Sequence, residues 1–280
     1  MAKPACLGGI SSVMKPRFFG VFLLVFILGG CSNPIFEFPN LDTETEQEVA
    51  AFRIATYNIH GGKGPNGEGN VRDNLITFHA LLHGEEILCF QEVVPDCWND
   101  VKSVFSDYPH RYFLPQVSTK FGTNKQGGNA IFSKFPIQGI DQQLIQCDPG
   151  GDKWERRAQY VRIYVGNDHQ YLNIFHYHNT YNWHSNNSES ERRGMEKFVD
   201  YVESKAIAES EMTIVLGDFN LQENQVNQII NASFYSNSTS NWVDHIFTNG
   251  PIISAGYYDT RGAKLSDHQA VWAVICNSDY

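Results

Sequence analysis

Short runs in which apolar and polar residues alternate make up much of the chain after residue 51, and this period of two is typical of β-strands. We predict eight strands, at residues 52–59, 86–91, 129–133, 159–165, 171–178, 212–216, 243–248 and 270–275. Gly166, Asn167 and Asp168 separate the fourth run from the fifth, so these two strands are expected to form a β-hairpin.

Three further segments repeat apolar residues at the helical spacing, at 72–82, 189–206 and 223–230. The middle segment has the clearest pattern, because Met195, Phe198 and Val202 fall on one side of the helix. Hairpins mixed with helices predict an α/β fold in which helices cover the outer faces of the sheets. No long Pro/Ser-rich linker follows residue 52, so residues 52–280 are expected to form one domain.

The N-terminal segment has a different pattern. Lys15 and Arg17 precede an uninterrupted apolar run over residues 18–28, which is too short to cross a bilayer and is typical of an export signal. The run ends in the letters LGGC, which resemble a bacterial lipobox, the motif whose cysteine is acylated and becomes the mature N-terminus. We therefore expect residues 1–30 to be a lipoprotein signal peptide and Cys31 to carry the lipid, so that the protein is exported and held at a membrane of the bacterial cell envelope.

Residues 31–51 are acidic and polar, as expected of a flexible tether between the lipid and the domain. A simple membrane anchor and a cleaved secretory signal stay open as alternatives for the first 30 residues.

The charge limits how this protein can bind a polyanion. The chain has a formal charge of −10, and without residues 1–30 it would have 18 basic against 31 acidic residues, a charge of −13. Such a body does not attract polyanions by its overall field, so a phosphate substrate needs metal ions or a local patch of Arg and Lys.

Four cysteines follow Cys31 in the chain: Cys89, Cys97, Cys147 and Cys276. Export permits disulfides, and all three pairings of four cysteines stay open. Cys89 lies inside an apolar strand, so we interpret it as a thiol packed in the core.

Acidic and amide side chains follow the apolar strands along the whole chain, at Asn58, Glu92, Asp218, Asn220, Asp244 and Asp267, with His268 beside the last. In the stretch TIVLGDFNLQ, strand periodicity places Asp218 and Asn220 on the same side. Carboxylates that converge repel one another, so a cation is expected between them. Oxygen ligands suit Mg²⁺, with Mn²⁺ or Ca²⁺ as alternatives, rather than zinc.

The blocks TYNIHGG, FQEV, GGNAIFSKFPI, VLGDFN, WVDHIF and LSDH occur in this order over about residues 52–276. Their order and spacing resemble the endonuclease/exonuclease/phosphatase superfamily, the group that includes deoxyribonuclease I. The resemblance implies a four-layer α/β sandwich of two mixed, largely antiparallel sheets with helices on the outer faces. It also implies an active site at one edge, where the strand ends meet.

The resemblance further implies a role for each polar strand end. Asn58 and Glu92 would bind the divalent metal, and Asp267 would contribute to the same or a second metal site. Asp218 would hold or activate the attacking water, and Asn220 would contact the phosphate. His268 would face the scissile phosphate, oriented by Asp244. We assign the general base jointly to the Asp244/His268 pair and Asp218.

Three positions leave a choice open. The family has a His at the end of a central strand, and we favour His178 over His176 because His178 stands at the strand's end. Arg156 and Arg157 are both candidates for a phosphate contact, and a surface ion pair is the alternative for at least one of them. Asn129 would lie close to the substrate, or would otherwise be a turn residue.

The substrate class follows less directly from the motifs. His245 replaces the Arg, and VLGDFN lacks the Trp, that inositol phosphatases usually carry, which argues against that branch. Tyr257 and Tyr258 could be membrane-entering aromatics like those of sphingomyelinases, or they could be packing residues. Few basic residues are available for nucleic acid: Lys125, Lys134, Lys153, Arg156, Arg157, Arg261 and Lys264.

We predict a Mg²⁺-dependent phosphodiester hydrolase, and more specifically an exported nuclease with nucleic acid as its favoured substrate. The alternatives are a lipid- or inositol-directed phosphodiesterase or phosphatase, and a non-catalytic binding lipoprotein on the same fold. Nothing in the sequence indicates a protein partner.

Overall fold

The computed structural model describes residues 36–37, 51–118, 125–147, 155–166, 171–181, 189–208, 211–230 and 237–276. The predicted signal peptide and Cys31 lie outside these ranges, as do Lys153 and most of the predicted tether. Two residues of that tether form strand β1 (Phe36–Glu37), which pairs with β4 (His110–Ser118). Residues Asn33–Tyr280 form one unit.

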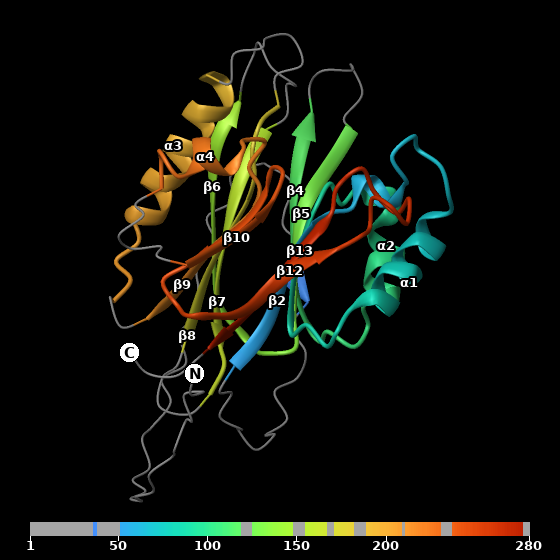
Figure 1. Cartoon of the computed structure of the whole chain (residues 1–280), viewed down its shortest axis with the longest axis horizontal. Helices are drawn as coiled ribbons and strands as arrows, with labels where there is room; N and C mark the ends of the chain where they lie inside the picture. Colours follow the sequence, from blue (N-terminus) through green and yellow to red (C-terminus); the bar gives the residue numbers. More distant parts are fainter. Residues whose placement is uncertain are drawn as a thin grey trace, which may run out of the picture. The chain divides into compact units, whose positions relative to one another are not determined.

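The strands of this unit form two sheets, which Figure 1 shows with helices on both outer sides. The seven-stranded sheet A has the order β1-β4-β5-β3-β2-β13-β12, with β2 (Ala51–Asn58), β3 (Ile87–Gln91), β5 (Lys125–Ser133), β12 (Ile252–Tyr258) and β13 (Ala270–Cys276). The six-stranded sheet B has the order β10-β11-β9-β8-β7-β6, with β6 (Ile137–Cys147), β7 (Glu155–Tyr164), β8 (Tyr171–His178), β9 (Met212–Asp218), β10 (Asn237–Asn241) and β11 (Asp244–Thr248).

Both sheets are mixed and largely antiparallel. Among the pairings of the described strands, β2 with β3 and β8 with β9 are parallel, and the others are antiparallel. The β7 and β8 strands pair antiparallel, which confirms the hairpin predicted from the Gly166 turn. Helices α1 (Val71–Leu81) and α2 (Pro95–Val104) lie on sheet A, and α3 (Glu189–Glu203) lies on sheet B (Figure 1).

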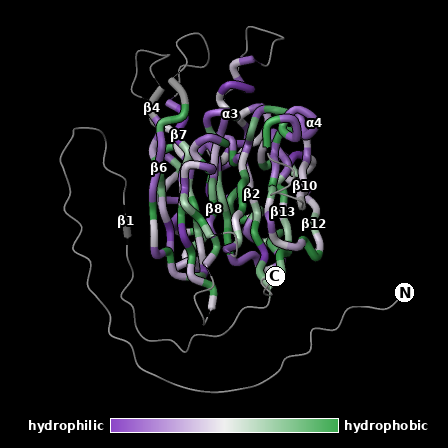
Figure 2. Tube along the Cα trace, turned by 90° about the vertical axis from the view of Figure 1, so that its left-hand side faces the viewer, coloured by the Kyte–Doolittle hydropathy of each residue, from purple (hydrophilic) through white to green (hydrophobic). Residues whose placement is uncertain are grey.

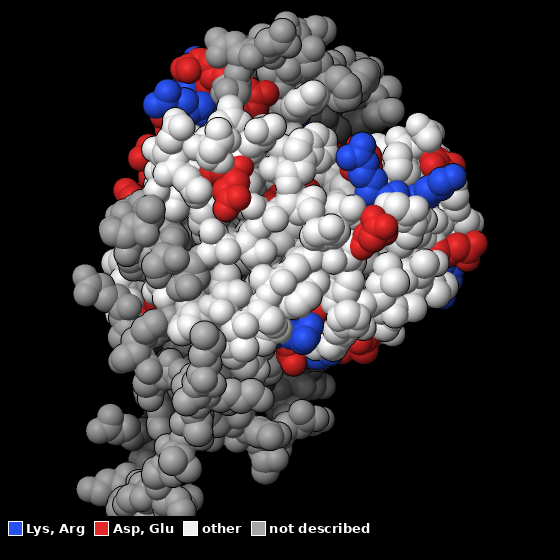
Figure 3. Space-filling model, in the orientation of Figure 1, with Lys and Arg blue, Asp and Glu red and all other residues white. Residues whose placement is uncertain are grey.

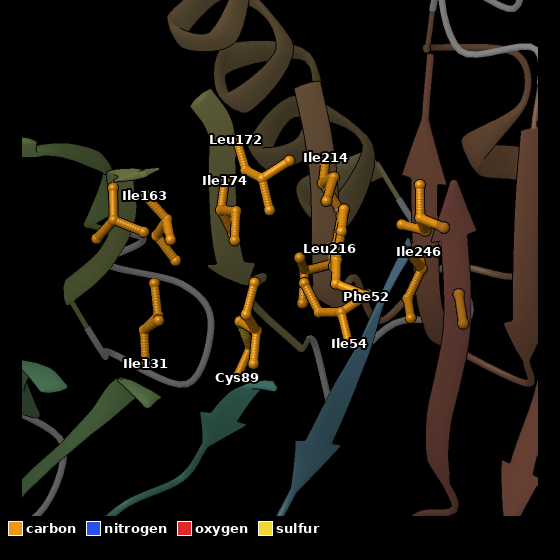
Figure 4. Packing of buried hydrophobic residues seen from close by; sticks show 14 of the residues in the cluster. Phe52, Ile54, Cys89, Ile131, Ile163, Leu172, Ile174, Ile214, Leu216 and Ile246 are labelled. Atoms are coloured by element: carbon orange, nitrogen blue, oxygen red, sulfur yellow. The ribbon is translucent and has the colours of Figure 1, made fainter. Parts of the chain in front are cut away.

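Three apolar clusters separate these four layers. The cluster between the sheets is built from inward-facing strand residues such as Ile54, Ile131, Ile174 and Leu216, which Figure 4 shows meeting from opposite sides. A second cluster joins α1 and α2 to sheet A, and a third joins α3 to sheet B. Hydrophobic stretches accordingly run along the strands, for example β2 and β13 (Figure 2). The predicted four-layer α/β sandwich is confirmed.

The fully buried Cys89 lies in the cluster between the sheets and has a free thiol, as predicted. Cys97 is also a buried free thiol, and the side chain of Cys147 lies outside the described residues. None of the helices in the described ranges is long and apolar enough to cross a membrane.

Several elements differ from the sequence pattern. Strands β4, β6, β10 and β12 and helix α2 were not predicted. The β10 sequence is Asn-Ser-Thr-Ser-Asn, and β12 lies at a sheet edge with exposed residues in succession, so neither shows an apolar alternation. Helix α2 did carry a sequence signal, because Pro95 stands in its first turn.

Some predicted bounds were also wrong. The helix predicted at 189–206 ends at Glu203, and the one predicted at 223–230 is α4 (Glu223–Val226), which is continued by turns. The strand predicted from Asn129 begins at Lys125. The strand predicted from Val243 begins one residue later, because Trp242 and Val243 form the turn between β10 and β11.

Candidate active site

The polar strand ends meet at one end of the two sheets. In sheet A the parallel strands β2 and β3 align Asn58 with Gln91, the residue before Glu92. In sheet B the register pairs Asp218 with His178 on one side and with Asp244 on the other. Because neighbouring parallel strands end at the same edge of a sheet, residues far apart in the sequence come together here.

Asn58 connects the two sheets. Its Nδ2 donates to Glu92 Oε1 at 3.1 Å and to Asp218 Oδ2 at 3.0 Å, and its Oδ1 accepts from the His60 backbone N–H at 3.0 Å. Asn58 and Asp218 are each 1% exposed, whereas the Glu92 side chain is about two-fifths exposed. The amide therefore holds two carboxylates close together, one buried and one facing solvent.

Asp218 closes strand β9, and Gly217 is required just before it. Gly217 has φ +144°, and a Cβ at this position would lie 1.9 Å from the backbone oxygen of Tyr177 in the neighbouring strand. The backbones of β8 and β9 thus approach too closely for any side chain. The close approach brings Asp218 opposite His178.

The strand periodicity predicted for Asp218 and Asn220 does not apply. The strand ends at Asp218, and Asn220 follows in a left-handed conformation with φ +51°. Asn220 donates its backbone N–H to Asp218 Oδ1 at 3.0 Å, and its side-chain Nδ2 donates to the Asn179 carbonyl at 3.1 Å. The two residues are therefore neighbours through a tight turn, because a carboxylate acceptor stabilises this turn.

Asp244 and His268 form a buried pair. His268 Nδ1 lies 2.7 Å from Asp244 Oδ2, and its Nε2 lies 3.7 Å from Asp218 Oδ2. Burial lowers the pKa of His268, but the charges of Asp244 and Asp218 and the hydrogen bond outweigh burial and raise that pKa overall. Burial also raises the pKa of Asp244, which His268 opposes. The pair therefore keeps at least one proton at neutral pH.

The two histidines of β8 have different surroundings. His178 Nε2 lies 3.4 Å from Asp218 Oδ2 and 4.0 Å from Glu92 Oε1. His178 therefore belongs to the cluster of polar side chains that surrounds Asp218. Burial, helped by the charges of Arg156 and His268, lowers the pKa of His178 well below its ordinary value. His178 is therefore neutral.

His176 lies deeper, between the sheets, and is fully buried. Its Nδ1 lies 2.8 Å from Gln159 Oε1, and its Nε2 contacts Gln91 Nε2. A neutral ring that donates from Nδ1 to Gln159 and accepts at Nε2 from Gln91 satisfies both contacts. Burial lowers the pKa of His176 to about 3.

The two candidate arginines also differ. Arg156 is 6% exposed, and its charge lowers the pKa of His178. Arg157 is about one-quarter exposed and forms an ion pair with Glu155, with Arg157 Nη2 and Glu155 Oε2 at 3.1 Å. Arg156 therefore lies close enough for its charge to act on His178. Arg157 instead forms a surface ion pair, which was the alternative to a phosphate contact.

Asn129 lies in β5, one residue before Ala130, which pairs with Phe90 of β3. Its side chain is fully buried, and neither Oδ1 nor Nδ2 has a hydrogen-bond partner within the part of the chain that the structure describes. Asn129 is thus a strand residue and not a turn residue, and its amide is available to a ligand.

Asp267 lies at the solvent side of the cluster, with its side chain about two-fifths exposed. Its Oδ1 is 3.8 Å from His60 Nδ1, and its charge raises the pKa of both Asp244 and His268. Ser266 Oγ donates to the Asn58 carbonyl at 2.7 Å, which ties the loop before β13 to the end of β2.

The donor set fits a hard divalent cation. Four carboxylates lie in this cluster: Asn58 joins Glu92 to Asp218, and the charges of Asp218 and Asp267 act on Asp244. Asp244 Oδ1 is buried without a hydrogen-bond partner in the described ranges, and Asp218, Asp244 and His268 place ligand atoms within 4.8 Å of one another. Oxygen donors of this kind suit Mg²⁺, Mn²⁺ or Ca²⁺.

Sequence reasoning missed two residues beside the cluster. Asn179 is fully buried and donates to the backbone carbonyls of Glu191 and Phe219, so it fixes the segments after β8 and β9. Trp242, in the turn before Asp244, lies against the His268 ring with 5.3 Å between the ring centroids. The block WVDHIF already placed Trp242 two residues from Asp244, and that proximity was the available signal.

Comparison with known proteins gives a family match and no match to a curated protein. The sequence profile of the Endonuclease/Exonuclease/phosphatase family matches residues 55–268. No curated protein matches the sequence.

Solved structures share the fold at low sequence identity. An endonuclease/exonuclease/phosphatase from Beutenbergia cavernae has 15% identity and a TM-score of 0.62, with 81% of this chain and 72% of that chain covered. Truncated TDP2 from Caenorhabditis elegans has 16% identity and a TM-score of 0.59, with 81% and 98% covered. Beta toxin from Staphylococcus aureus has 16% identity and a TM-score of 0.57, with 79% and 99% covered.

Proposed function

Because the chain belongs to the endonuclease/exonuclease/phosphatase family, whose members are generally phosphoester hydrolases, we propose that it is a Mg²⁺-dependent phosphodiesterase and that its substrate is nucleic acid. One observation carries the proposal. Residues from five strand ends and one loop, spread between Asn58 and His268, gather around Asp218 with donor atoms of the kind that phosphodiester hydrolysis needs.

Glu92 and Asp267 are the residues that would hold the cation, and Asn58 would join them only through Oδ1, the atom that accepts from the His60 N–H. When bound, Mg²⁺ neutralises charge on the phosphoryl oxygens. The Asn58 amide keeps Glu92 and Asp218 side by side despite their repulsion. Glu92 has φ +55°, a backbone conformation that is costly for a residue other than glycine and that is found most often at functional sites.

The remaining residues handle protons and orient the phosphate. Asp218 is the acceptor that orients the attacking water, because its Oδ2 faces the cluster while its Oδ1 is fixed by the Asn220 N–H. His268, kept protonated by Asp244, donates toward the phosphate or the leaving oxygen from Nε2. Neutral His178, Asn129 and Arg156 supply further donors to the phosphate. Because His268 is protonated in this proposal, the general base is Asp218, the other member of the joint assignment made from the sequence.

The cellular location is part of the same proposal. The charged start, the apolar run and the LGGC motif support an exported lipoprotein acylated at Cys31. A nuclease so placed acts on nucleic acid outside the cytoplasm.

A lipid-directed phosphodiesterase is the second candidate. It was favoured by the pair Tyr257 and Tyr258, but these two side chains differ in exposure. Tyr258 is 6% exposed, and its hydroxyl donates to the buried Glu85, while Tyr257 is 56% exposed. Only one of the two could enter a membrane.

The test is a panel of supercoiled DNA, RNA, sphingomyelin and phosphoinositides, each with Mg²⁺ and with EDTA. Single-stranded and duplex DNA are included, and His268→Ala is the inactive control. We expect Mg²⁺-dependent cleavage of nucleic acid that His268→Ala loses. Absence of metal-dependent turnover on every phosphoester would leave a non-catalytic binding role, and turnover of sphingomyelin alone would replace the nuclease by the lipid-directed enzyme.

A further inference from the structure

Trp242 occupies a backbone conformation that its residue type disfavours. Asn241 and Asp244 are paired across β10 and β11, so Trp242 and Val243 form a two-residue hairpin turn. Trp242 has φ +59°, and Val243 is not among the described residues with positive φ. A positive φ at the first turn residue alone is the pattern of the type II′ turn, where glycine is the usual residue. Burial in the core does not offset the backbone strain at Trp242, because its side chain is 56% exposed.

The exposed ring stands beside the reacting groups. Trp242 and His268 have ring centroids 5.3 Å apart at an angle of 39°, and His268 Nε2 in turn faces Asp218 at 3.7 Å. The Arg261 guanidinium carbon lies 6.0 Å from the Trp242 ring centroid. Arg261 is exposed, and within the described part of the chain its side chain contacts the Trp242 ring. A half-exposed flat aromatic surface and a cation therefore flank the place where the phosphate is proposed to react.

We propose that Trp242 is a stacking platform for an unpaired nucleobase next to the scissile phosphate, with Arg261 contacting the neighbouring phosphate. The inference rests on the proposed phosphodiesterase function and narrows its substrate to single-stranded nucleic acid. Bases inside a duplex already stack on both faces, whereas an unpaired base offers a free face to an aromatic side chain.

The other substrate classes fit this surface less well. A choline headgroup is a cation and would bind a tryptophan face by cation–π attraction, but Arg261 already places a positive charge at the Trp242 ring. Inositol and ceramide have no flat aromatic group to stack. Stacking also supplies affinity that charge does not, since Lys and Arg do not gather into a broad patch on the face shown in Figure 3.

The experiment uses the full chain and thymidylyl-thymidine, a dinucleotide with one phosphodiester bond, together with two analogues that each lack one thymine base. The variant Trp242→Gly removes the ring and relieves the positive-φ strain, so its thermal midpoint should equal or exceed that of the wild type. Trp242→Phe keeps an aromatic face. Tyr257→Ala is the matched control, because Tyr257 is also 56% exposed but makes no ring contact with His268 in the structure.

We expect the wild type to prefer thymidylyl-thymidine over one of the analogues by about 10-fold to 100-fold in kcat/KM, the range that base stacking on an aromatic side chain supplies. Trp242→Gly should lose this preference, while Trp242→Phe and Tyr257→Ala keep most of it. Equal preference in Trp242→Gly and wild type would overturn the stacking role. So would a wild type that cleaves all three compounds at the same rate, although the phosphodiesterase itself would then stand. Absence of Mg²⁺-dependent cleavage of every phosphoester would instead refute the proposed function.

Discussion

The buried neutral His176 makes the stability of this protein depend on pH in a way that can be measured. His176 is fully buried between Gln91 and Gln159, and burial lowers its pKa to about 3 from an ordinary value of 6.5. As the pH falls, His176 is therefore protonated near pH 6.5 in the unfolded chain, but only near pH 3 in the folded chain. Stability from this residue is fully present above pH 6.5 and is lost as the pH falls toward 3.

The size of the effect follows from the interval between the two pKa values. One unit corresponds to roughly 1.4 kcal/mol, so His176 lowers the free energy of unfolding by about 2 kcal/mol at pH 5 and by roughly 5 kcal/mol below pH 3. His176→Gln removes the titrating group and keeps a polar side chain. We expect the slope of unfolding free energy against pH, between pH 4 and 6, to be smaller in this variant by about 1.4 kcal/mol per pH unit.

Urea unfolding at a series of pH values measures that slope, and a general loss of packing does not change it. Ile174→Val is the control, since Ile174 is fully buried in the same strand and its truncation costs about 1 kcal/mol without removing a proton site. If His176→Gln and Ile174→Val keep the wild-type slope alike, the assignment of a buried neutral His176 is refuted.

Further predictions concern the site and its frame. Asp218→Asn should lower kcat at least ~100-fold with little change in thermal midpoint, as general acid–base catalysis contributes on that scale; wild-type kcat in this variant would contradict the role given to Asp218. Gly217→Ala should destabilise the fold by at least ~3 kcal/mol in urea unfolding, because its Cβ would lie 1.9 Å from a backbone oxygen. Mg²⁺ at 100 times its Kd should stabilise the folded protein by about 2.7 kcal/mol. EDTA should reverse that shift, and Glu92→Gln should not show it at the same Mg²⁺ concentration.

Much of the fold could be predicted because buried strands carry a local signature. The apolar runs before Asn58, Glu92 and Asp218 predicted β2, β3 and β9 to within a few residues. Edge strands such as β10 and β12 bury little, so their pattern is weak and they were missed. Helix α3 was found because its apolar residues lie on one continuous face.

The candidate site divides in the same way. Asn58, Glu92, Asp218, Asp244 and His268 were predicted because each follows or precedes an apolar strand, a feature of local order. The sequence favoured His178 over His176 by its position at the strand's end. The structure adds that His178 lies beside Asp218, whereas His176 contacts Gln159 between the sheets. Other features depend on backbone conformation and on distant partners, which no local pattern shows. They are the turn at Asn220, the different exposure of Tyr257 and Tyr258, and the contact between Trp242 and His268.

The sequence by itself determined which polar side chains stand at the ends of apolar strands, because apolar alternation and the residue types at strand ends are properties of neighbouring positions. Tertiary structure alone decided which of those side chains touch. Asn58 and Asp218 are 160 positions apart and hydrogen-bond only because two different sheets stack face to face. That stacking is the result of burying an apolar layer between the sheets, and no local pattern encodes the register in which the two sheets meet.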